Sequence, residues 1–160
     1  MQPISSLAPT SVTARIFVRA ASGRQRLNVL GTFNAITRQL IAVINTTVVN
    51  SETMCELLRK IAAQGLAGPI TPVLDNARYQ RNAMVQTLAK ELGITLLFLP
   101  SYSPNLNLIE RLWRFLRRRA IHGRYHPTFE QFQGAIVDTI DHLPRDHADS
   151  LASLMTLNFQ

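Results

Sequence analysis

Two acidic residues occupy positions from which they could act on phosphate. Asp75 follows a short apolar segment, Ile70–Leu74, and Glu110 opens an amphipathic segment that is rich in arginine. The 34 residues between them can hold a helix, a strand and a loop, so both carboxylates can reach one edge of a sheet. Paired carboxylates beside a basic surface favour metal-assisted phosphoryl transfer on nucleic acid. No acidic residue precedes Glu52, so an upstream strand cannot supply a third carboxylate.

The segments around these acids predict the frame that holds them. A strand over Ile70–Leu74, a helix over Ala83–Leu92 and a strand over Ile94–Leu99 form a strand–helix–strand unit, which should be right-handed and parallel. Both strands then end at one edge of the sheet, with Asp75 at the first end and the path to Glu110 leaving the second. Ligands bind at this carboxyl edge in open α/β sheets.

The remaining segments predict more strands and helices. Apolar alternation predicts two strands, Leu27–Asn34 and Gln39–Ile44, joined as a hairpin, and an extended segment over Ala14–Ala20. Pro72 favours either an edge position or a strand start, whereas the apolar run 94–99 is typical of a strand buried on both faces. The order predicts an α/β sheet that changes from antiparallel to parallel. Further helices are expected from the N-cap Asn50 to an end at Gly65, over Asn107–Ile121, over Thr128–Leu143 and around Leu151.

The helix expected over Asn107–Ile121 has an apolar stripe and a basic face. At helical spacing the stripe consists of Ile109, Leu112, Trp113, Leu116 and Ala120. Glu110 lies beside this stripe, and arginines share or flank its face, where they could hold the phosphates next to a scissile one. The residues expected to contact DNA, one of them after the strand 70–74, are Arg78, Arg111, Arg114, Arg117 and Arg118.

Composition agrees with one globular domain that favours polyanions. The chain has 160 residues, a net charge of +7 and 46% hydrophobic residues. Its 15 arginines and two lysines suit bidentate phosphate contacts, although genome base composition gives the same bias. The single cysteine, Cys55, excludes an internal disulfide and a cysteine-based zinc cluster. No signal peptide or membrane-length apolar run occurs, so a cytoplasmic protein with no membrane contact is expected.

Each feature also has a purely structural interpretation. Glu110 would be the N3 residue of a helix capped by Asn107, where glutamate closes a capping box. Asp75 and Asn76 can form an ordinary turn after a strand, and the arginines can be a solvated helix face. Taken singly, these interpretations are favoured, because short motifs match by chance. The four histidines match no zinc spacing, and we expect them at the surface or facing DNA.

In combination the motifs are specific. Two segments closely resemble one family: LDNARYQ at 74–80 and LFLPSYSPNLNLIERLW at 97–113. They resemble the catalytic core of DDE transposases of the mariner superfamily. Within that superfamily they resemble the bacterial insertion-sequence branch, which has 34 residues between the second and third acids. GRQRLNVLGTFNA at 23–35 resembles the family's second and third strands. Asp75 matches the second acid and Glu110 the third. The other residues that carry the motifs are Asn76, Pro100, Tyr102, Ser103, Pro104, Asn107 and Trp113.

The resemblance implies a ribonuclease-H-like α/β fold, a mixed sheet with flanking helices, and cut-and-paste transposition of DNA. It also implies three carboxylates that hold two Mg²⁺ or Mn²⁺ ions, with Asp75 and Glu110 as catalytic residues and metal ligands. The family's first acid lies on the central strand, upstream of Gly31, where this chain has no Asp or Glu. Gln80 stands where a histidine is common. We therefore expect an N-terminally truncated transposase that lacks the first, central strand.

The expected organisation is a loose segment 1–13, a partial catalytic domain 14–145, and a tail or short helix 146–160. Three functions remain open. The chain is a transposase fragment that is inactive alone, which we prefer; or an active nuclease once a separately encoded upstream piece joins it; or a basic DNA-binding or regulatory remnant that interferes with intact transposase. The expected partners are DNA, that upstream piece and further copies of the chain.

Overall fold

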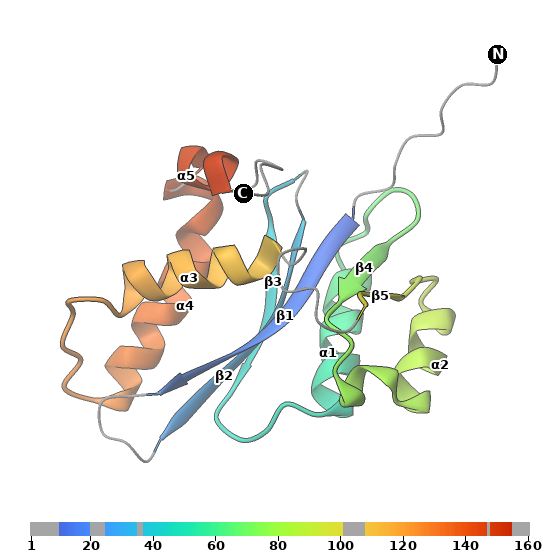
Figure 1. The fold of residues 1–160 in the computed structure, drawn as a ribbon, viewed down its shortest axis with the longest axis horizontal. Coiled ribbons are helices and arrows are strands. Elements are labelled where there is room, and N and C mark those ends of the chain that lie inside the picture. The colour runs from blue at the N-terminus through green and yellow to red at the C-terminus, as the bar shows by residue number, and fades with distance from the viewer. Residues whose placement is uncertain (1–9, 20–24, 35–36, 101–107, 147, 155–160) are drawn as a thin grey trace.

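A five-stranded mixed sheet forms the middle of this computed structural model, with strand order β3-β2-β1-β4-β5 (Figure 1). On one side of β1 the pairing is antiparallel, and on the other side it is parallel, which confirms the predicted change within the sheet. The strands are β1 (Thr10–Arg19), β2 (Arg26–Asn34), β3 (Leu40–Asn45), β4 (Thr71–Leu74) and β5 (Leu97–Phe98). The structure describes residues 10–19, 25–34, 37–100, 108–146 and 148–154.

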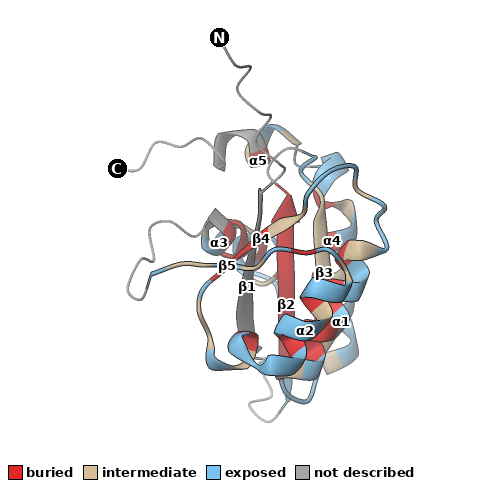
Figure 2. Ribbon diagram, turned by 90° about the vertical axis from the view of Figure 1, so that its right-hand side faces the viewer, coloured by how far each residue is buried: buried red, intermediate tan, exposed pale blue. Residues whose placement is uncertain are grey.

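Helices cover both faces of the sheet, so the fold has three layers (Figure 1). The two layers of helix are α1 (Ser51–Ala62) with α2 (Ala83–Glu91), and α3 (Leu108–Ala120) with α4 (Phe129–Asp146) and α5 (Ala148–Leu154). Each layer buries its own apolar cluster against the sheet, and Figure 2 shows the buried side of α1 and α2 turned toward β2. None of the helices in the described ranges has the length and hydropathy to cross a bilayer.

The central position in the sheet is filled, which corrects one expectation. The ribonuclease-H-like mixed sheet is confirmed, but the expected absence of its first strand is wrong, because β1 pairs with β2 over Ser11–Arg19 and with β4 over Thr10–Thr13. The expected extended segment began at Ala14, whereas β1 begins at Thr10. The Thr- and Ser-containing start of β1 carries little apolar alternation, so pairing with the two neighbouring strands, rather than local pattern, determines where the strand begins.

The two parallel strands follow expectation to different degrees. β4 lies between β1 and β5 rather than at an edge, and Pro72 is the second residue of this strand, so its position agrees with the strand start that was the other interpretation. β5 is the edge strand, and it is only two residues long, with Leu97 52% exposed. An apolar run shows that residues are available for burial, but it cannot tell an inner strand from a short edge strand followed by a loop. Their parallel pairing, by contrast, is as predicted.

Helix ends follow local chemistry closely. The Asn50 side chain accepts a hydrogen bond from the Thr53 backbone N–H at 3.0 Å, as predicted for the N-cap of α1. Thr128 Oγ1 likewise accepts from the Gln131 backbone N–H at 3.2 Å before α4. The predicted end of α4 before Pro144 is wrong, because the helix runs through Pro144 to Asp146. A proline in the last turn removes only one backbone hydrogen bond, so the helix can continue for two more residues.

Close packing of α3 on β2 gives a first stability prediction. A Cβ at Gly31 would lie 3.2 Å from two ring carbons of Trp113 and 3.3 Å from Leu40 Cδ1, all of them in or against the core. Gly31→Ala is therefore expected to destabilise the fold by about 1–3 kcal/mol, because the indole must shift. Urea unfolding would measure this. Gly134→Ala in α4 is the matched control, since nothing lies within 4 Å of its Cβ, and this change should stabilise by up to about 1 kcal/mol. Equal stability of the two variants would contradict the close contact.

Candidate functional site

The first candidate acid stands just beyond the end of β4. Val73 and Leu74 are buried in the clusters on opposite faces of the sheet, and Asp75 follows them as an exposed residue. The chain leaving β5 is held alongside, because the Leu99 backbone N–H donates to the Leu74 carbonyl at 2.8 Å. The ends of both parallel strands therefore lie at one edge next to Asp75, as the chain order predicts.

The turn that carries Asp75 is fixed by several contacts. Asn76 adopts a left-handed backbone conformation (φ +70°), and its side-chain oxygen accepts a hydrogen bond from Arg81 Nε. The guanidinium of Arg81 lies 4.8 Å from the centre of the Phe98 ring in β5. Gln80, which is fully buried, accepts from the Ala77 backbone N–H at 2.9 Å through its side-chain oxygen. These contacts form around the short 3₁₀ helix η1 (Arg78–Arg81), which the sequence analysis does not predict.

The second candidate acid opens α3. Glu110 is exposed in the first turn of this helix, where a carboxylate is stabilised by the helix dipole whatever its function. Ile109 and Leu112 beside it are fully buried, so the helix is fixed in rotation, with Glu110 off its buried face. The predicted apolar stripe of α3 is confirmed, since its members Ile109, Leu112, Trp113, Leu116 and Ala120 are all buried.

Helix α3 packs across the central strand, and its first turn begins on the side of the molecule where β4 lies next to β1 (Figure 1). The chain thus follows the predicted path, and on this path we expect Asp75 and Glu110 to share a site. Their separation, which we expect to be roughly 4–8 Å between carboxylates, stays a prediction. Neither acid forms an ion pair with another residue in the described part of the chain.

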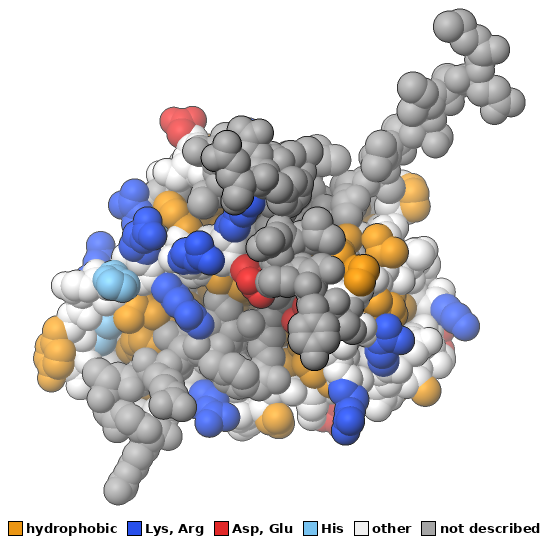
Figure 3. All heavy atoms as spheres, viewed as in Figure 1, with side chains coloured by type: hydrophobic (Ala, Val, Ile, Leu, Met, Phe, Trp, Pro, Cys, Tyr) orange, Lys and Arg blue, Asp and Glu red, His pale blue; other side chains and the backbone are white. Residues whose placement is uncertain are grey.

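The predicted DNA-contacting arginines are mostly at the surface. Arg78, Arg114, Arg117 and Arg118 are exposed, and Arg111 is half-buried. Figure 3 shows basic side chains gathered over the part of the molecule where α3 lies. Two more exposed arginines, Arg119 and Arg124, belong to the same stretch but were not among the predicted residues. The sequence does indicate that these two arginines extend the basic surface, because no acidic residue occurs between Glu110 and Glu130.

The other motif residues divide into three groups. Tyr102, Ser103, Pro104 and Asn107 lie outside the described residues. Pro100 is exposed beyond β5. Trp113 is 5% exposed and belongs to the core under α3, so its role in this structure is packing.

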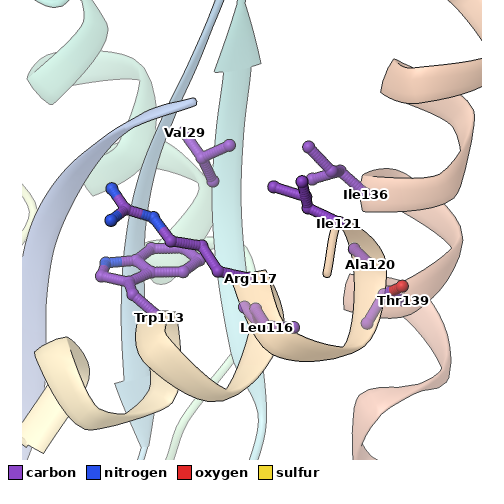
Figure 4. Close-up of a pocket in the computed structure, with 8 residues that line it drawn as sticks. All are labelled: Val29, Trp113, Leu116, Arg117, Ala120, Ile121, Ile136 and Thr139. Carbon is purple, nitrogen blue, oxygen red and sulfur yellow. The ribbon is translucent and has the colours of Figure 1, made fainter. Parts of the chain in front are cut away.

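The only feature of Trp113 that points away from simple packing is its indole N–H. Nε1 is buried and has no hydrogen-bond partner among the residues that the structure describes. A cavity of about 20 Å³ adjoins the ring, with room for about one water molecule and with mostly apolar walls. Figure 4 shows the Arg117 side chain passing beside the indole at this cavity. The space is too small for a substrate, and we interpret it as imperfect packing between α3, α4 and β2.

The residues present do not fit a two-ion site. Such a site needs three carboxylates, yet the described residues contain no group of three Asp, Glu, His or Cys side chains that could hold a metal. β1 contributes no acid, since Thr10–Arg19 reads TSVTARIFVR. Asp75 and Glu110 together offer ligands for at most one hard cation, which would keep several of its waters.

Comparisons with solved structures agree with this architecture. A catalytic domain of Mos1 mariner transposase superposes with a TM-score of 0.65 at 13% identity, covering 91% of this chain and 82% of that chain. The catalytic core of BIV integrase gives 0.57 at 16% identity, covering 86% and 84%. A chain of the simian T-cell lymphotropic virus intasome gives 0.64 at 18% identity and covers 84%, but this chain spans only 49% of it. At these identities the likeness shows a shared fold, that of transposase and integrase catalytic cores.

Sequence comparison identifies the family. No curated protein matches the chain. The family model described as DDE superfamily endonuclease matches residues 8–133, which include all five strands, both candidate acids and the arginine-rich helix. This protein therefore belongs to the DDE superfamily endonucleases.

Proposed function

We propose that this chain is the catalytic-core portion of an insertion-sequence transposase and that, by itself, it binds DNA without cutting or joining it. One observation carries the proposal: the central strand of a DDE-family fold is present here, but it has no acidic residue along Thr10–Arg19. Asp75 and Glu110 stand at the end of β4 and the start of α3, in the order expected for the second and third acids.

The missing acid explains the expected inactivity. In two-metal catalysis two ions about 4 Å apart clamp the attacking and leaving oxygens, and a shared carboxylate helps to hold the ions in place. The Mos1 transposase catalytic domain has been solved with Mg and with Mn, which supports divalent ions as the family's cofactor. With only Asp75 and Glu110, the clamp on the leaving oxygen cannot form, although the basic surface that would hold DNA is retained.

DNA binding is expected to be weak, independent of sequence and sensitive to salt, because it rests on arginine–phosphate contacts. Replacing Arg114 and Arg117 with Ala should lower the slope of log K against log salt by about one to two units. Fluorescence anisotropy with a labelled duplex between low and moderate salt would measure this slope. The matched control is Arg59→Ala with Lys90→Ala, which removes the same charge from exposed positions on α1 and α2.

Two results would contradict the proposed surface. One is duplex binding that does not depend on salt, and the other is an equal loss of slope in the control pair. The second result would mean that net charge, rather than the face of α3, determines binding.

The retained basic face also favours a second function. A chain that binds DNA but lacks one metal ligand could occupy transposon ends and so interfere with an intact transposase. In a transposition assay with an active relative, adding this chain should then lower the yield, and the Arg114/Arg117 variant should lower it less. No inhibition by a chain that binds duplex DNA would remove this second function.

A further inference from the structure

The turn between α3 and α4 presents an aromatic side chain to solvent. Tyr125 is 83% exposed, more than any other large apolar residue in the described ranges. It stands between Arg124, which is exposed, and His126, which is half-buried. A tyrosine exposed to this degree contributes little to the core.

The exposure of Tyr125 is built into the turn. His126 Nε2 forms a hydrogen bond of 3.1 Å with the Ala120 carbonyl oxygen at the end of α3. Nε2 is the donor, because a carbonyl oxygen can only accept. The His126 ring also packs edge-on against Phe132, which is buried in α4, with 5.9 Å between ring centres. On the other side, the Arg124 backbone N–H donates to the Ile121 carbonyl at 3.2 Å. His126 is thus tied to both helices and Arg124 to the turn that follows α3, so Tyr125 projects from an anchored backbone.

The electrostatic surroundings of Tyr125 favour a polyanion. Between Glu110 and Glu130 the chain has six arginines and no acidic residue. Arg118 and Arg119 in the last turn of α3 are exposed, and Arg119 lies over the Phe115 ring at 5.6 Å. An exposed aromatic residue beside arginines is the combination that binds single-stranded nucleic acid, because arginines hold phosphates while the ring stacks on a base.

We propose that Tyr125 is a stacking contact for an unpaired DNA base and that Arg124 holds a neighbouring phosphate. The inference rests on the proposed function, since it takes DNA as the partner, and it goes further by naming the form of DNA that this turn would bind. A duplex hides the faces of its bases in the stack, so only an unpaired nucleotide, such as one at a frayed or cut end, can stack on Tyr125. Phosphate contacts of α3, by contrast, serve single and double strands alike.

The test compares a single-stranded oligonucleotide with the duplex of the same sequence by fluorescence anisotropy at one salt concentration. Tyr125→Ala is expected to weaken single-strand binding about tenfold, which is within the range for loss of one base stack, and to leave duplex binding unchanged. Tyr125→Phe should retain single-strand affinity, because the ring face remains. Met84→Ala, at an exposed apolar residue of α2, is the control for surface truncation. Thermal unfolding of each variant would verify that the fold is intact.

Several outcomes would overturn the inference. They are an equal loss on duplex and single strand, no loss on either, or a loss in Tyr125→Phe as large as in Tyr125→Ala. Preferential stacking on an RNA strand of the same sequence would overturn the choice of DNA. If the parent chain binds no DNA in any form, the proposed function fails as well. If it binds duplex DNA with the expected salt dependence while Tyr125→Ala changes nothing, only the role of the turn fails.

Discussion

Replacing Ala14 with Asp is expected to raise the affinity of this chain for Mn²⁺ at least about tenfold, the effect of about 1.4 kcal/mol. The position follows from strand register. Thr13 pairs with Leu74 in the parallel ladder, so the next residue of β1 comes beside Asp75. In the antiparallel ladder Ala14 pairs with Gly31, where a Cβ would lie 3.2 Å from the Trp113 ring of α3. Position 14 therefore lies in the sheet between Asp75 and a residue on which α3 packs, and α3 carries Glu110.

The gain should depend on charge and on the existing acids. A third carboxylate adds a hard oxygen ligand of the type that Mn²⁺ and Mg²⁺ prefer. Titration calorimetry or Mn²⁺ electron paramagnetic resonance would compare Ala14→Asp with Ala14→Asn, which is similar in size but neutral. The gain should also vanish in the double variant with Asp75→Ala. A gain that survives Asp75→Ala, or that Ala14→Asn reproduces, would show that position 14 does not complete this site.

The same variants test catalysis. The parent chain with Mn²⁺ is not expected to nick supercoiled DNA, because one ligand of the two-ion clamp is missing. Any nicking that appears in Ala14→Asp should disappear on changing Asp75 or Glu110 to Ala. Robust metal-dependent nicking by the parent chain, abolished by Asp75→Ala, would contradict the proposed function.

Much of the fold could be predicted because strong local patterns agree with the final packing. The apolar stripe of α3 and the Asn50 cap of α1 are examples, since each depends only on residues a few positions apart. The start of β1 and the edge position of β5 depend instead on which strands pair at long range. A local pattern contains no information on that choice.

The candidate site shows the same division. The sequence predicts which elements carry Asp75 and Glu110, because both lie next to clear element boundaries. It does not predict the 3₁₀ turn around Gln80. There the buried Gln80 side-chain oxygen, rather than a backbone carbonyl, accepts the hydrogen bond from the Ala77 backbone N–H. Nor does it predict the exposure of Tyr125, which depends on the anchoring of His126 to the end of α3. Both features arise from side-chain contacts with backbone groups, which no periodic pattern reveals.

Trp113→Ala is expected to destabilise the fold by about 3–5 kcal/mol, because it empties the space between α3 and β2. The residue is 5% exposed, and its ring carbons lie against Gly31. Trp113→Phe should cost much less, about 1 kcal/mol, since most of the ring is kept and the buried N–H that has no partner is removed. Urea unfolding would give both values, with Leu112→Ala as a fully buried control on the same helix.

The comparison of the two Trp113 variants also separates packing from DNA contact for a residue of the family motif. If the indole serves packing, Trp113→Phe keeps duplex binding and its salt slope, because Arg114 and Arg117 stay in place on a folded α3. Binding by Trp113→Ala should then fall only in proportion to the fraction of unfolded protein. A loss of duplex binding in Trp113→Phe at unchanged stability would show instead that the indole N–H acts at the DNA surface, and that the burial of this residue is incidental to its role.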